Sequence, residues 1–314
     1  MATVAPGLAP AASAQEARPR RREWLTALTA AVRTPRGAVG LSLALLVVLI
    51  AAIGPSLAPH GLSDLVTSDY AKPSAHFLLG SDGVGRDVLS RVLNGGWVLL
   101  LMAGAATVLG VGVGAVAGIS AAYLRGIADG VIMRTVDVIL SFPQLVFALL
   151  LLSLIGPKLW LIVLAVAISH APQVGRVIRA ATLDVAEQDY VKAVELTGMR
   201  PGRVMRTEIL PNLVTPLMVE IGLRLTYSIV IIAGLAFLGF GQEPPAATWG
   251  ELINDNRGAL SLNPWAVIAP ALLIALLTIG TNTFTDAIAR VAIGVDRRPE
   301  EAALLDDIGP RGVA

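Results

Sequence analysis

The sequence predicts an all-α polytopic membrane protein with six transmembrane helices, and three observations support this prediction. Of the 314 residues, 55% are hydrophobic and only 15% are charged. The mean hydropathy is +0.71, far above the value of a soluble domain. The charged residues are also clustered, so they leave long apolar windows with few charges, and about 20 apolar helical residues are enough to cross a hydrocarbon core of roughly 30 Å.

Six such windows follow one another along the chain. They cover residues 38–58, 97–122, 135–156, 159–175, 212–239 and 264–288. The fourth is the shortest, because His170 and Pro172 stand at its end. We therefore expect this helix to end near residue 175.

Composition and missing motifs exclude several classes of function. The chain has no cysteine, and its three histidines are too far apart in sequence to form a ligand pair, so no metal site is expected. No phosphate-binding loop of the type G-x4-G-K-[ST] and no hydrolase signature occurs, so we expect no catalytic residue and no cofactor bound by this chain. The net charge of +1 gives no reason to expect a nucleic-acid partner.

The distribution of Lys and Arg predicts the topology. Most of them fall in segments that share a side with the N-terminus, which places both termini in the cytoplasm. The expected organisation is a flexible tail with an interfacial amphipathic helix, the transmembrane domain and a cytoplasmic tail, over residues 1–37, 38–291 and 292–314. Within the domain, residues 59–96 and 240–263 would form extracytoplasmic loops and residues 173–211 a cytoplasmic segment.

Two patterns inside the windows predict helix contacts. Gly110, Gly114 and Gly118 recur every four residues, which gives one helix a smooth face for close packing. Glu220 and Arg224 are four residues apart, in the favourable order for a helical ion pair. Ionisable groups in a span are also candidates for function, but a pair that neutralises itself near the interface is the favoured interpretation.

The charged stretch "DYVKAVELTGMRPGRVMRTEILPNL" at 189–213 is predicted to form two short helices. A helix from Gln188 to Leu196 would end at a left-handed Gly198, and Pro201 would start a second helix that stops before Pro211. Between two membrane spans such a pair could not easily wrap a DNA duplex. Docking onto a cytoplasmic protein is the favoured function, with apolar side chains filling a groove.

This stretch resembles the EAA signature of ABC importer permeases, Glu-Ala-Ala-x3-Gly-x9-Ile-x-Leu-Pro. Ala193, Gly198, Leu210 and Pro211 occupy matching positions. Lys192, Val194 and Glu208 depart from the signature. The resemblance implies that residues 193–206 form a coupling helix, with Met199 and Arg203 also touching the ATPase.

Further motifs extend the resemblance over residues 38–298. "LLGSDGVGRDVLSRVLNG", "MRTVDVILSFP", "LAFLGFGQEPPAATWGELI" and "NPWAVIAPALLIALLTI" are similar to the C-type permease of the dipeptide, oligopeptide and nickel importer group. The resemblance implies a type I importer fold, of the MetI-like kind, in a bacterial plasma membrane. The implied partners are a homologous B-type permease, two ATPase subunits or domains that use ATP and Mg, and an extracytoplasmic solute-binding protein.

Peptide is the first expected cargo, with nickel or another small solute as the alternative. A secondary transporter is a third possibility, of a different class, and it would need no ATPase. The resemblance places possible pathway or gate residues at Glu220, Arg224, Ile232 and Phe237. It places possible contacts to the binding protein at Asp82, Arg86, Asp87 and Trp249.

Overall fold

The fold is a bundle of long helices, seen in a computed structural model that describes residues 23–241, 245–246 and 248–293. Five helices are long and apolar enough to cross a membrane. They are α2 (Pro35–Leu57), α4 (Gly96–Leu124), α7 (Leu159–Ala186), α10 (Val214–Phe237) and α12 (Trp265–Ile293). The described part of the chain contains no strand, which confirms the all-α prediction. The predicted tails lie mostly outside the described residues.

The third predicted span is bent. Residues 135–156 fall on α5 (Gly126–Leu140) and α6 (Gln144–Ile155), whose axes differ by 81°. The break holds Phe142 and Pro143, and a residue before proline is driven out of the helical region by the proline ring. The described residues therefore hold six spans if the bent pair counts as one.

The fourth predicted span is longer than expected. Helix α7 continues past the buried Pro172 to Ala186, so the expected end near residue 175 was wrong. A proline removes one backbone hydrogen bond, but neighbouring helices compensate for this loss in a membrane bundle. The first part of the expected cytoplasmic segment 173–211 is consequently a continuation of α7.

Helices α4 and α7 form the closest seam of the bundle. A Cβ atom built on Gly114 would lie 2.5 Å from the carbonyl oxygen of Ala171, and one on Gly118 would lie 2.5 Å from that of Gly175. Only glycine permits such an approach of two backbones. The predicted role of this glycine face in helix packing is confirmed.

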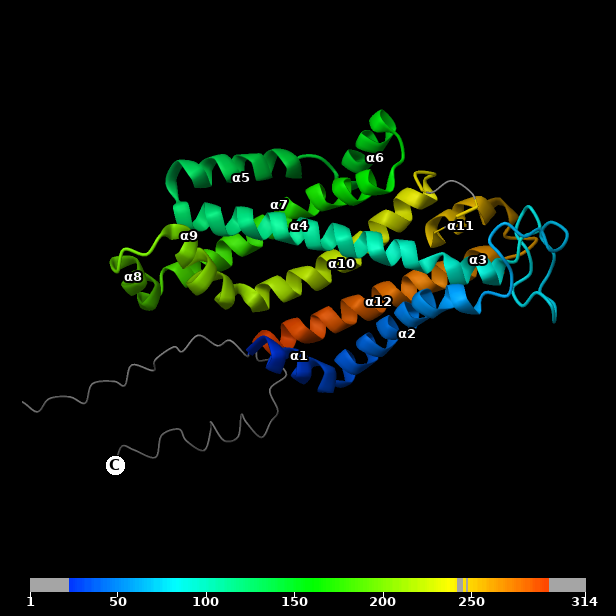
Figure 1. Ribbon diagram of the computed structural model, residues 1–314, viewed down its shortest axis with the longest axis horizontal. Coiled ribbons are helices and arrows are strands. Elements are labelled where there is room, and N and C mark those ends of the chain that lie inside the picture. Colours follow the sequence, from blue (N-terminus) through cyan, green and yellow to red (C-terminus); the bar gives the residue numbers. More distant parts are fainter. Residues whose placement is uncertain (1–22, 242–244, 247, 294–314) are drawn as a thin grey trace, which may run out of the picture.

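The remaining elements gather at the two ends of the bundle (Figure 1). Helix α12 packs along α2, and α10 packs against both α4 and α12. The loop over 58–87, α3 (Val88–Asn94) and α11 (Trp249–Asn256) lie at one end, and α8 (Asp189–Leu196) and α9 (Pro201–Val204) lie at the other. Helix α1 (Glu23–Arg33) is not isolated, because Ala31 packs on Ala287 and Ile288 of α12.

Replacing Gly114 by alanine is expected to destabilise the bundle by about 1–3 kcal/mol, the usual cost of overpacking. The matched control is Gly104→Ala on the same helix, where a Cβ would meet no atom within 4 Å. Alanine is the better helix former, so the control should be neutral or stabilising. Thermal unfolding of the purified protein in detergent would compare the two, and equal midpoints would contradict the packing role of the seam.

Candidate functional site

The charged stretch forms a helix-turn-helix at one end of the bundle. Helix α8 begins at Asp189 after an extended Gln188, and the turn passes through Gly198 with φ of +78°. Arg200 is extended, and Pro201 opens α9. The predicted end of the first helix at Leu196, the left-handed Gly198 and the start of the second helix at Pro201 are confirmed.

Three buried side chains fix this element to the bundle. Val204, Ile209 and Leu213 are fully buried, and Ile209 and Leu213 share an apolar cluster with Ile119 of α4 and Ile178 of α7. A hydrogen bond of 3.0 Å from the Asn212 side chain to the Tyr190 hydroxyl joins α8 to the chain after α9. Contacts on both sides of the turn therefore fix the helix-turn-helix to the bundle.

The second helix of the element does not stop before Pro211. After α9 the chain winds through a π-helical turn, Met205–Ile209, and a 3-10 turn, Leu210–Leu213, directly into α10. The wide turn followed by a tight one accommodates a residue that has no N–H to donate. Pro211 therefore lies within a continuous helical path, and the expected stop was wrong.

The outward face of the element carries an exposed leucine together with exposed charged side chains of both signs. Leu196 is 90% exposed, a larger fraction than for any other large hydrophobic side chain in the described part of the chain. Arg200, Arg203 and Arg206 are exposed, as are Ala193, Gly198 and Leu210, whereas Met199 and Pro211 are half-buried. An exposed leucine on an element with exposed charged side chains is a surface suited to a partner protein with an apolar groove and a charged rim.

Glu220 and Arg224 form the predicted helical pair. The Nε atom of Arg224 donates to the Glu220 carboxylate at 3.0 Å, and both residues are buried. Arg224 also donates from Nη1 to Gln173 of α7 and stacks 5.5 Å from the ring of Tyr227. The charge is thereby neutralised inside the bundle, as the structural interpretation predicted.

Ile232 and Phe237 do not join this pair. Ile232 is buried in the main apolar core, and Phe237 lies near the far end of α10 beneath Arg257, whose guanidinium is 5.7 Å from the ring. The four expected pathway residues are thus spread along α10 and form no single site in this conformation.

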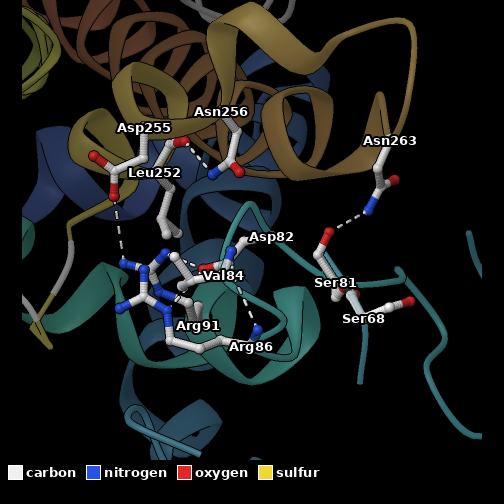
Figure 2. A network of polar contacts seen from close by, with 10 residues as sticks. All are labelled: Ser68, Ser81, Asp82, Val84, Arg86, Arg91, Leu252, Asp255, Asn256 and Asn263. Atoms are coloured by element: carbon white, nitrogen blue, oxygen red, sulfur yellow. Dashed lines mark hydrogen bonds and ion pairs between the residues drawn. The ribbon is translucent and has the colours of Figure 1, made fainter. Parts of the chain in front are cut away.

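The opposite end of the bundle is held by a buried ionic network (Figure 2). Asp82 accepts from Arg86 at 2.8 Å and from Arg91 of α3 at 2.6 Å, and its other oxygen accepts two backbone N–H groups at 3.0 Å. These donors keep the pKa of Asp82 low in spite of the opposing effect of burial. Arg91 reaches Asp255 of α11 at 3.5 Å, so the network joins the loop, α3 and α11.

The other residues expected to contact a binding protein are also mostly buried. Asp87 caps α3 by accepting from the Ser90 backbone at 3.0 Å, and Trp249 is fully buried and donates to the Val92 carbonyl at 2.8 Å. Their side chains hold the outer loop in place. The sequence reasoning missed Arg91 and Asn263; Asn263 donates to the carbonyls of Leu79 and Ser81 at 2.9 and 3.0 Å.

Removing the charge of Asp82 should destabilise the outer loop, because Arg91 would keep its buried charge and lose its nearest carboxylate. For Asp82→Asn we expect a loss of about 3 kcal/mol. Asp64→Asn is the control, since Asp64 is exposed and accepts only a backbone bond from Gly61 within the described chain. Thermal unfolding and protease cleavage within residues 59–87 measure the difference; no difference between the variants would refute the role of Asp82.

Glu251 of α11 predicts a dependence of stability on pH. Burial raises the pKa of its carboxyl to about 7 from 4.5, although the Thr248 backbone donates to it. Between these two pKa values the folded state keeps a proton on Glu251 that the unfolded state has lost. The contribution of this carboxyl to the free energy of unfolding is therefore fully present below pH 4.5 and is lost as the pH rises to about 7. Glu251→Gln should therefore gain stability over the parent chain between pH 5 and 8, measured by unfolding midpoints; a constant difference would contradict this.

Comparison with known proteins shows the family of the chain. Residues 110–292 match the family of binding-protein-dependent transport system inner membrane components. A di/tripeptide transport system permease protein DppC of Pseudomonas aeruginosa is 34% identical over 81% of this chain and 86% of the relative. A dipeptide transport system permease protein DppC of Haemophilus influenzae is 31% identical over 84% and 96%.

Among solved structures, the MetNI methionine ABC transporter in an inward-facing form aligns with a TM-score of 0.49 and 17% identity, over 63% of this chain and 96% of the other. The sequence matches, with the six-span helical fold, lead to one conclusion. The chain belongs to the family of binding-protein-dependent transport system inner membrane components.

Proposed function

We propose that the chain is the peptide-conducting permease subunit of an ATP-driven importer and forms half of a pathway across a bacterial plasma membrane, with both termini in the cytoplasm. The observation that carries this is the match over most of the chain to relatives named as dipeptide and di/tripeptide permeases. The chain is a transporter subunit and not an enzyme. Its family works in general with a second permease, an ATPase and a binding protein.

The helix-turn-helix of α8 and α9 is the proposed contact to the ATPase. Its exposed Leu196 would enter a groove of the ATPase, with Ala193, Gly198, Met199 and Arg203 around it. Leu210 and Pro211 would then transmit movement, because they lie on the helical path into α10. ATP and Mg would bind to the ATPase subunits, and closure of those subunits would move the two permeases relative to each other.

The end with α3 and α11 is the proposed receiving surface for the solute-binding protein. Asp82, Arg86, Asp87 and Trp249 act there as positioning residues, since their contacts fix the loop while leaving Leu65 and Leu78 exposed. A loop held by buried ion pairs presents these exposed side chains at a low cost in conformational entropy on binding.

Reconstitution tests the proposed function directly. The chain would be co-expressed with a homologous permease and ATPase subunits, purified as a complex and placed in proteoliposomes with the binding protein. A library of peptides of two to five residues would be supplied, and accumulated peptides identified by mass spectrometry. ATP-dependent accumulation of peptides is expected; uptake of nickel instead, or uptake without ATP, would overturn the proposal.

The turn at Gly198 provides a test of coupling. Gly198→Val should reduce uptake about tenfold, because a left-handed conformation costs a β-branched residue about 1–2 kcal/mol, and 1.4 kcal/mol is tenfold in an equilibrium. Gly198→Asn is the matched control, since asparagine tolerates this conformation. Uptake and ATPase stimulation by the loaded binding protein would be measured together. Equal activity of both variants would contradict a role of the turn at Gly198 in coupling.

A further inference from the structure

A small cavity lies in the membrane domain at the bend between α5 and α6. It measures about 70 Å³, room for a few water molecules but too little for a whole peptide. Its polar lining consists of Gln144 on α6 and Ser169 and Gln173 on α7, and Phe142 and Phe147 contribute aromatic walls. Phe142 is 51% exposed, so the cavity lies at the accessible edge of the bundle.

A chain of hydrogen bonds fixes the orientation of Gln144. Its Nε2 lies 3.0 Å from Nδ1 of His170, and Nε2 of His170 lies 3.0 Å from the Ser228 hydroxyl. Ser228 is 3.1 Å from the Thr107 hydroxyl, which donates to the Ala103 carbonyl at 2.7 Å. The amide nitrogen of Gln144 faces His170 and can only donate, so Gln144 donates to His170, His170 to Ser228, and Ser228 to Thr107.

This direction leaves the carbonyl oxygen of Gln144 as an acceptor without a partner among the described residues. In Gln173 the amide nitrogen, and not the oxygen, lacks a partner. Arg224 donates to the carbonyl oxygen of Gln173, so Nε2 of Gln173 remains a donor without a partner in the described part of the chain. The two glutamines that line this cavity therefore carry one amide oxygen and one amide nitrogen without a partner among the described residues, and a buried residue holds each amide in place.

A peptide group carries one N–H donor and one C=O acceptor, the complement of this pair. Building on the proposed function, we propose that Gln144 and Gln173 bind a main-chain amide of the transported peptide at this cavity, with Phe147 bounding the space for an adjacent side chain. Main-chain recognition of this kind accepts peptides of different sequence. A polar pair that served only to join helices would be satisfied within the bundle.

The first test changes the size of the cavity. Phe147→Ala should raise the uptake of library peptides with Phe, Tyr or Trp relative to those with Ala or Gly by a few-fold, because the wall is removed. Phe284→Ala on α12, a half-buried phenylalanine far along the chain, is the control and should leave this ratio unchanged. A general loss of stability lowers all uptake but does not change the ratio.

The second test does not depend on Phe147. The chain has no cysteine, so Ser169→Cys creates its only thiol. In a complex with cysteine-free partners, binding protein loaded with the best-imported library peptide, plus ATP, should slow thiol labelling at position 169 relative to unloaded binding protein plus ATP. Ser153→Cys, at an exposed position of α6 outside the cavity, should show no such difference.

The outcomes separate the two proposals. An unchanged peptide ratio in Phe147→Ala together with no protection at position 169, in a complex whose parent form imports peptides, overturns the cavity assignment alone. If Phe147→Ala does not assemble, protection at position 169 decides. A parent complex that imports no peptide overturns the proposed function, and this inference with it.

Discussion

The architecture depends on the backbone contact between α4 and α7. In a bilayer no hydrophobic force brings two apolar helices together, so van der Waals packing must do so, and the glycine face of α4 lets the backbones meet. This seam fixes the position of α7 along α4. It thereby places His170 next to Ser228 and Ile178 against Ile209. Both the polar chain inside the bundle and the anchoring of the charged helices follow from it.

The local features of the fold could be predicted from the sequence. Gly198 and Pro201 act on their own backbone, so the ends of α8 and the start of α9 were predictable without knowledge of the neighbours. Pro143 and Pro172 show the limit of such reasoning. Pro143 is exposed and lies at the break between α5 and α6. Pro172 is buried among neighbouring helices and lies inside α7, which continues past it.

The tertiary features could not be predicted in this way. Asp82 and Trp249 were expected at a docking surface because the outer segments that hold them resemble those of the importer permeases, yet Trp249 donates to the carbonyl of Val92, far away along the chain. Thr107 and Ser228 are 121 positions apart, and neither has a local pattern that indicates the other. Such partners become visible only when helix packing has brought the spans together.

The two irregular turns between α9 and α10 have opposite effects on the winding of the helical path. The π-helical turn over Met205–Ile209 is wider than an α-helical turn and advances less per residue, whereas the 3-10 turn over Leu210–Leu213 is tighter and advances more. Because the two turns follow each other directly, their rotations oppose, and α10 continues close to the phase that α9 sets. The outward surface of α9 and the contact of Arg224 with Gln173 of α7 therefore lie on one helical path with little net rotation between them.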